Sequence, residues 1–72
     1  MGWCSGDRML ADVWLEIRPH IPEEKRVDLL VRLVHYFEGE DMDCYDHVIE
    51  VPEGKAALKQ IHSSWFEWEG EN

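Results

Sequence analysis

The chain has 72 residues, enough for one small domain, and its formal net charge is −9. Residues 1–37 carry five basic and six acidic side chains, whereas residues 38–72 carry two basic and ten acidic ones. Because contacts to phosphate need Lys and Arg, this charge argues against direct binding of nucleic acid or of an anionic membrane, and favours a partner protein with a basic surface.

A first helix is predicted over residues 7–18, where apolar residues recur at helical spacing. They are Leu10, Val13, Trp14 and Ile17. Asp7 is expected to cap the start of this helix, and Pro19 ends it because the residue before a proline is disfavoured in helical geometry. The link to the next element is short, which favours two antiparallel helices.

A second helix is predicted over residues 22–38, and it is the central element of the chain. Its main apolar face holds Val27, Leu30, Val31, Val34 and Phe37. Leu29, Leu33 and Tyr36 extend the apolar surface onto a second face, and Gly39 is expected to close the helix in a left-handed conformation. Both faces need cover, which the rest of the chain or a second copy in a homodimer would provide.

The second half begins with an acidic turn and is predicted to form one or two shorter helices, over about residues 43–50 and 53–66. A strand over residues 44–51 is the alternative for the first of these, because HVIEV is rich in β-branched residues. A lone strand would lack a pairing partner, so helix is favoured. The predicted fold class is all-α: a small bundle of three to four helices built on an antiparallel helical hairpin.

Cys44 and His47 form a C-x-x-H pair, which is half of a zinc site, and Cys4 is a conceivable third ligand. Two cysteines are too few for a disulfide scaffold, no signal peptide is recognisable, and no apolar run approaches the ~18–20 residues that span a bilayer. We therefore expect a cytoplasmic protein with reduced thiols and no cofactor. A metal-binding or thiol-redox module built on Cys4, Cys44 and His47 is the alternative function.

Catalysis has little support, because the chain shows neither a nucleophile elbow nor a glycine-rich phosphate loop. The expectation is a protein that is not an enzyme. The distinctive feature is instead a combination of acidic and aromatic side chains in the second half, which suits an interface with a basic partner. The candidate partner-binding residues are Glu40, Asp41, Asp43, Asp46, Trp65, Phe66 and Trp68. The structural alternative is that Trp65 caps the core.

The opening MGWCSG, the segment D-V-W…I-R-P-H-I-P-E-E-K-R-V and the run F-E-G-E-D-M-D-C resemble short, mostly uncharacterised proteins of tailed bacteriophages and prophages. The resemblance covers residues 1–46, and residues 47–72 depart from the pattern. It implies an accessory phage protein made in the host bacterial cytoplasm, and no established activity. Combined with the charge pattern, it suggests a protein that binds a host protein, with inhibition of that protein and DNA mimicry as narrower versions.

Overall fold

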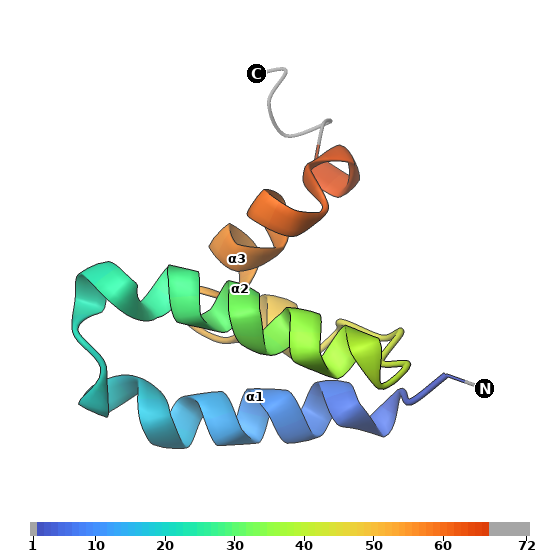
Figure 1. Cartoon of the computed structure of the whole chain (residues 1–72), viewed down its shortest axis with the longest axis horizontal. Helices are drawn as coiled ribbons and strands as arrows, with labels where there is room; N and C mark the ends of the chain where they lie inside the picture. The colour runs from blue at the N-terminus through green and yellow to red at the C-terminus, as the bar shows by residue number, and fades with distance from the viewer. Residues whose placement is uncertain (1, 67–72) are drawn as a thin grey trace.

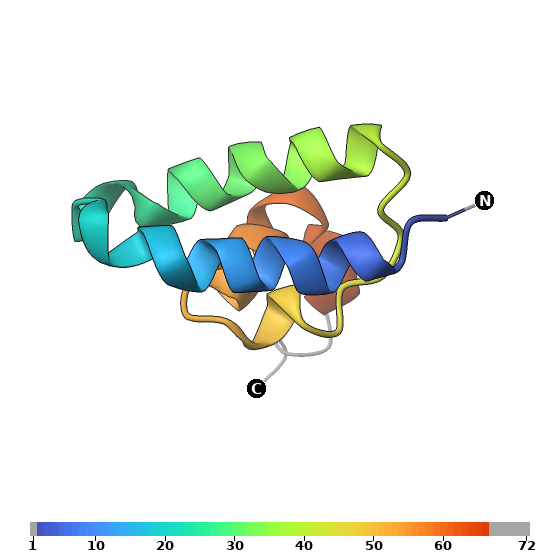
Figure 2. The same ribbon diagram turned by 90° about the horizontal axis from the view of Figure 1, so that it is seen from below.

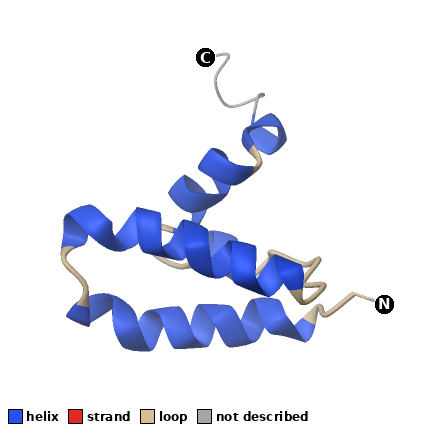
Figure 3. Ribbon diagram, viewed as in Figure 1, coloured by secondary structure: helices blue, strands red, loops and turns tan. Residues whose placement is uncertain are grey.

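The computed structural model describes residues 2–66, and these residues form α-helices and short 3-10 segments with no strand among them (Figure 3). In chain order the elements are α1 (Ser5–Ile17), η1 (Arg18–His20), α2 (Glu23–Gly39), η2 (Val48–Glu50) and α3 (Gly54–Ile61). The prediction of an all-helical protein is confirmed, and the alternative strand over residues 44–51 is wrong.

The helices α1 and α2 lie side by side and run in opposite directions, with η1 in the turn between them (Figure 1). Seen from below, α1 lies in front of α3, and α2 and η2 lie on opposite sides of α1 (Figure 2). The last helix, α3, contacts both α2 and η2. The amphipathic helices thus bury their apolar faces against one another, as the hydrophobic periodicity requires.

The core is made by side chains from α1, α2 and α3, from the segment between α2 and α3, and from the turn after α3. Its buried apolar residues are Leu10, Ala11, Trp14, Leu30, Val34, Met42, Val48, Val51, Ala57, Leu58 and Phe66. Trp14 is the largest fully buried side chain. Its indole N–H donates to the carbonyl of Pro52 at 3.0 Å and to the Glu53 carboxylate at 3.1 Å, so burial leaves this polar group satisfied.

The predicted left-handed closure of α2 occurs at a different residue. Gly39 is the last helical residue, and Asp41 has the positive φ of 72°. The N–H of Met42 donates to the carbonyl of Phe37 at 3.1 Å, and that of Asp41 to the carbonyl of Glu38 at 3.0 Å. These two bonds are a Schellman motif, and Met42 supplies its buried apolar contact. Glycine at position 39 was therefore a misleading signal.

The predicted helix over residues 43–50 is also wrong. Residues 42–45 are irregular, and only the single turn of η2 follows them. Side chains of this segment are held from outside it, since Cys44 is bonded to Cys4 and Tyr45 bonds to Glu38. Such tertiary contacts fix the backbone in a path that local helix propensity does not favour.

The start of α3 requires a glycine. A Cβ atom at Gly54 would lie 1.8 Å from the carbonyl oxygen of Val48, so only glycine lets the helix begin this close to η2. The preceding residue, Glu53, has a φ of 70°, and its carboxylate binds the Arg18 guanidinium through bonds of 2.8 and 2.7 Å. Those hydrogen bonds hold the pKa of Glu53 below its ordinary value. The α-helix ends at Ile61, and a 3-10 turn occupies residues 63–66.

Candidate functional site

The N-terminal segment is fastened to the loop that follows α2. Trp3 donates its backbone N–H to the carbonyl of Asp41, and its ring stacks on Phe37 with centroids 5.5 Å apart. A Cβ atom at Gly6 would lie 2.7 Å from the Trp3 ring, so the glycine makes room for the indole. Trp3 therefore holds the acidic loop, residues 40–46, against the end of α2.

A disulfide between Cys4 and Cys44 completes this fastening, with Cα atoms 4.9 Å apart and a separation of 40 positions in the sequence. The structure has these two thiols joined in a disulfide, which differs from the prediction of reduced thiols. The cysteines meet because the start of α1 and the loop after α2 lie at the same end of the helix pair, at a separation that disulfide geometry accepts.

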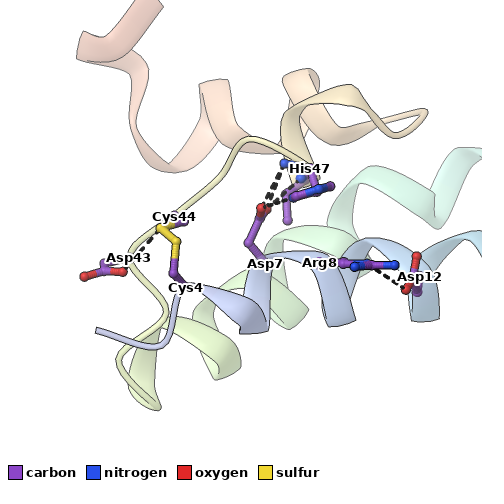
Figure 4. Close-up of polar contacts among 8 residues, drawn as sticks. Cys4, Asp7, Arg8, Asp12, Asp43, Cys44 and His47 are labelled. Carbon is purple, nitrogen blue, oxygen red and sulfur yellow. Dashed lines mark hydrogen bonds and ion pairs between the residues drawn. A yellow bond between two sulfur atoms is a disulfide. The ribbon is translucent and has the colours of Figure 1, made fainter. Parts of the chain in front are cut away.

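Asp7 connects α1 to the start of η2 instead of capping its own helix. Its carboxylate, 1% exposed, accepts the backbone N–H groups of His47 at 2.9 Å and of Val48 at 2.8 Å. The ring Nδ1 of His47 lies 2.7 Å from the same carboxylate (Figure 4). The cap residue of α1 is Cys4, so the prediction for Asp7 was wrong about which helix it serves. A contact across 40 residues leaves no local signal in the sequence.

The three candidate metal ligands Cys4, Cys44 and His47 are therefore not brought together. Cys4 and Cys44 meet, whereas the His47 ring is directed to Asp7 (Figure 4). Among residues 2–66, a group of three metal-ligating side chains does form from Cys4, Cys44 and Asp43, with ligand atoms within 4.8 Å of one another. Sequence spacing paired Cys44 with His47, but the fold puts Asp43 beside the two sulfur atoms.

A second polar cluster joins α2, the acidic loop and the end of α3. The Glu38 carboxylate accepts hydrogen bonds from the Tyr45 hydroxyl and, at 2.7 Å, from His62 Nε2. The His62 ring stacks on Trp65 with centroids 3.9 Å apart, and the Tyr45 ring makes T-shaped contacts with both of these rings. This cluster places Trp65 next to a residue of the acidic loop.

The protonation states in this cluster follow from its contacts. Burial opposes ionisation of Glu38, but hydrogen bonds from Tyr45 and His62, with the charges of His62 and His35, hold the pKa of Glu38 below its ordinary value. Burial and the bond to Glu38 raise the pKa of the Tyr45 phenol. At neutral pH the Glu38 carboxylate is therefore ionised, and the neutral Tyr45 phenol donates a hydrogen bond to it.

The candidate carboxylates Glu40, Asp41, Asp43 and Asp46 are all exposed. Within residues 2–66 none of the four takes part in an ion pair with a basic side chain. The opposite holds for Glu53, which is paired with Arg18. The acidic loop thus presents its charge to solvent.

The three aromatic candidates have different positions. Trp65 is 45% exposed, whereas Phe66 is 9% exposed and belongs to the core, with the Lys59 ammonium 5.8 Å from its ring centroid. Phe66 is therefore not part of an aromatic surface. Trp68 lies outside the described residues.

No protein-family model matches the chain, and no curated protein and no solved structure matches it significantly. No helix within residues 2–66 combines the length and apolar composition that a bilayer-spanning helix needs. The geometry of the chain itself is therefore the basis for a proposed function.

Proposed function

We propose that this chain is a non-enzymatic accessory protein of a bacteriophage that binds a host protein through an acidic and aromatic surface. This surface, the acidic–aromatic surface, consists of Glu40, Asp41, Asp43, Asp46 and Trp65. Its partner is a protein of the host bacterial cytoplasm with a basic surface. Inhibition of that protein, and imitation of DNA by the carboxylates, are narrower versions of the same proposal.

The observation that carries the proposal is the contact between Tyr45 and Trp65, whose ring centroids are 5.0 Å apart. Tyr45 belongs to the acidic loop, so this contact puts the exposed indole next to one residue of that loop, which supports a single surface of carboxylates and indole. Interfaces commonly combine an aromatic anchor with surrounding polar groups.

The charge of the loop supports a basic partner. The four carboxylates are exposed, and within residues 2–66 they lack basic partners, so their field reaches into solvent. Opposite charges on two proteins accelerate their encounter, whereas a buried aromatic side chain slows dissociation. The two parts of the surface would therefore have separate kinetic effects.

A non-enzymatic role is proposed because residues 2–66 hold two carboxylate–histidine pairs, Asp7 with His47 and Glu38 with His62, and neither is hydrogen-bonded to a Ser, Thr or Cys. The hollow beside His47 has a volume of about 280 Å3. Its lining residues are Ala11, Asp12, Leu15, His47, Glu50, Val51 and Pro52. None of these is a Ser, Thr or Cys, so the hollow brings no nucleophile to the His47 ring.

Capture from host lysate tests the proposal. The tagged wild-type chain is compared with the triple variant Asp41→Asn, Asp43→Asn, Asp46→Asn and with Trp65→Ala, at low and high salt. We expect one host protein to be retained by the wild type at low salt, and to be reduced in both variants and at high salt.

The matched control carries the same change of charge elsewhere. Glu16→Gln, Glu23→Gln and Glu24→Gln neutralise three exposed carboxylates of α1 and α2. Retention by this control should equal that of the wild type. Equal loss in both triple variants would show that net charge, and not the acidic–aromatic surface, determines capture.

The alternative of a metal-binding or thiol-redox module is not favoured in its original form. His47 is occupied by Asp7, and the two sulfur atoms are bonded to each other. Loss of host capture on removal of Cys44 or His47, with no effect of the acidic substitutions, would restore it.

A further inference from the structure

The fold brings two sulfur atoms from distant parts of the chain next to a third metal-ligating group. Cys4 precedes α1, and Cys44 lies in the loop after α2, with Cα atoms 4.9 Å apart. The two sulfur atoms and a carboxylate oxygen of Asp43 all lie within 4.8 Å of one another. Figure 4 shows the three side chains together, away from the contact between Asp7 and His47.

We propose that, once the disulfide is reduced, Cys4, Cys44 and Asp43 bind one Zn2+ ion through two thiolates and one carboxylate oxygen. A water molecule fills the fourth position of the tetrahedron. Thiolate, imidazole and carboxylate are the ligands that Zn2+ accepts in tetrahedral sites. The sulfur atoms select against Ca2+ and Mg2+, which take oxygen ligands in larger number.

The chemical balance of the change is simple. A dithiol reductant transfers two electrons and two protons to the sulfur atoms of Cys4 and Cys44, and its own sulfur atoms join in a disulfide. Binding of Zn2+ then displaces the two protons from the protein thiols. The disulfide between the start of α1 and the acidic loop is thereby replaced by coordination of both thiolates to one metal ion.

The accessibility of the group fits an ion taken up from solvent, because Cys4 and Asp43 are exposed and Cys44 is half-buried. A bacterial cytoplasm keeps thiols reduced, so the dithiol form is the relevant one in that compartment. The inference takes its reducing compartment from the proposed function, but metal binding is measured on the chain alone and does not depend on a host partner.

The test uses Co2+ as a spectroscopic probe of the full chain, reduced with a phosphine so that no added thiol competes for metal. We expect one equivalent of Co2+ to give thiolate-to-cobalt charge-transfer absorption, which Zn2+ then removes. Zn2+ should also raise the melting temperature of the reduced wild type. Cys4→Ser with Cys44→Ser should abolish the absorption.

Three single variants identify the remaining ligand. Removal of a group that only hydrogen-bonds to a metal ligand lowers metal affinity by about 10–100-fold. Asp43 is proposed as a ligand itself, so Asp43→Asn should weaken binding by at least about tenfold. Asp46→Asn removes a neighbouring exposed carboxylate, and His47→Gln removes the histidine of the C-x-x-H pair. Both should bind Co2+ as the wild type does.

The inference is overturned if the reduced wild type gives no charge-transfer absorption, or if Asp43→Asn binds as tightly as Asp46→Asn. Loss of binding in His47→Gln would also overturn it, because the site would then use the histidine. Asp43→Asn keeps both cysteines, so the circular dichroism of its oxidised form shows whether the variant is folded before reduction.

Discussion

The Asp7 carboxylate is removed from water and depends on protein donors for its hydrogen bonds. The backbone N–H groups of His47 and Val48 supply these bonds and in turn lose their own contact with water. The buried carboxylate and the two backbone donors satisfy one another. Removal of either would leave buried polar groups without a hydrogen-bond partner. This residue therefore fixes where η2 begins.

Replacement of Asp7 should be strongly destabilising. Asp7→Ala leaves two backbone donors without an acceptor, and we expect a loss of about 2–3 kcal/mol in the free energy of unfolding. Denaturation with urea, followed by circular dichroism, measures it.

Asp12→Ala is the matched control, because Asp12 lies on the same helix and makes only an exposed contact of 4.0 Å with Arg8. It should change stability by less than about 0.5 kcal/mol. Equal effects of the two substitutions would contradict the role assigned to Asp7.

At the scale of elements, the periodicity of apolar residues was sufficient to locate α1 and α2 within two residues at each end. The whole of α3 lies within the helix predicted over residues 53–66, because Ala57 and Leu58 lie on one helical face, but the α-helix ends at Ile61 and not at residue 66. Local pattern determines these elements because each buries one stripe of its surface.

The segment after α2 could not be predicted in the same way. Its path depends on Cys4 and Asp7, which lie about 40 residues earlier in the chain. A pairing of two cysteines across that distance has no signature in one sequence. The same is true of the contact between Tyr45 and Trp65, so the candidate surface was predicted as a composition but not as an arrangement.

The contacts of Glu38 join α2 to the acidic loop and to α3, and they make stability depend on pH. Because the pKa of Glu38 is lowered in the folded chain, its stabilising contribution is complete above the ordinary value of 4.5 and is lost as the pH falls through the folded value. Glu38→Gln should be less stable than the wild type at pH 7, and the difference should vanish in acid.

Unfolding in urea at a series of pH values measures this difference. Glu40→Gln is the control, because Glu40 is an exposed carboxylate two residues away. Its stability should follow that of the wild type at every pH. A difference for Glu38→Gln that persisted unchanged into acid would contradict an ionised Glu38 in the folded chain.

At the scale of the whole molecule, part of the apolar surface faces solvent. Tyr36 is 70% exposed, Met9 51% and Val13 42%. Leu29 and Leu33, at helical spacing from Tyr36, are half-buried. We propose that a second copy covers this surface in a homodimer.

Sedimentation equilibrium tests the homodimer. We expect dimer at ~100 μM, a concentration above the dissociation constants of modest protein complexes. Tyr36→Asp should shift the chain to monomer, whereas Leu15→Asp, on the side of α1 that faces η2, should not. Monomer alone at ~100 μM for the wild type would contradict the proposal.

The central claim, that the acidic–aromatic surface binds a basic partner, is tested most directly by association rates across a salt series with the purified host protein. The rate for the wild type should fall as salt rises. The triple variant Asp41→Asn, Asp43→Asn, Asp46→Asn should associate more slowly and with a flatter salt dependence, while the matched variant of Glu16, Glu23 and Glu24 follows the wild type. Identical salt dependences for the wild type and the acidic-loop variant would contradict the claim.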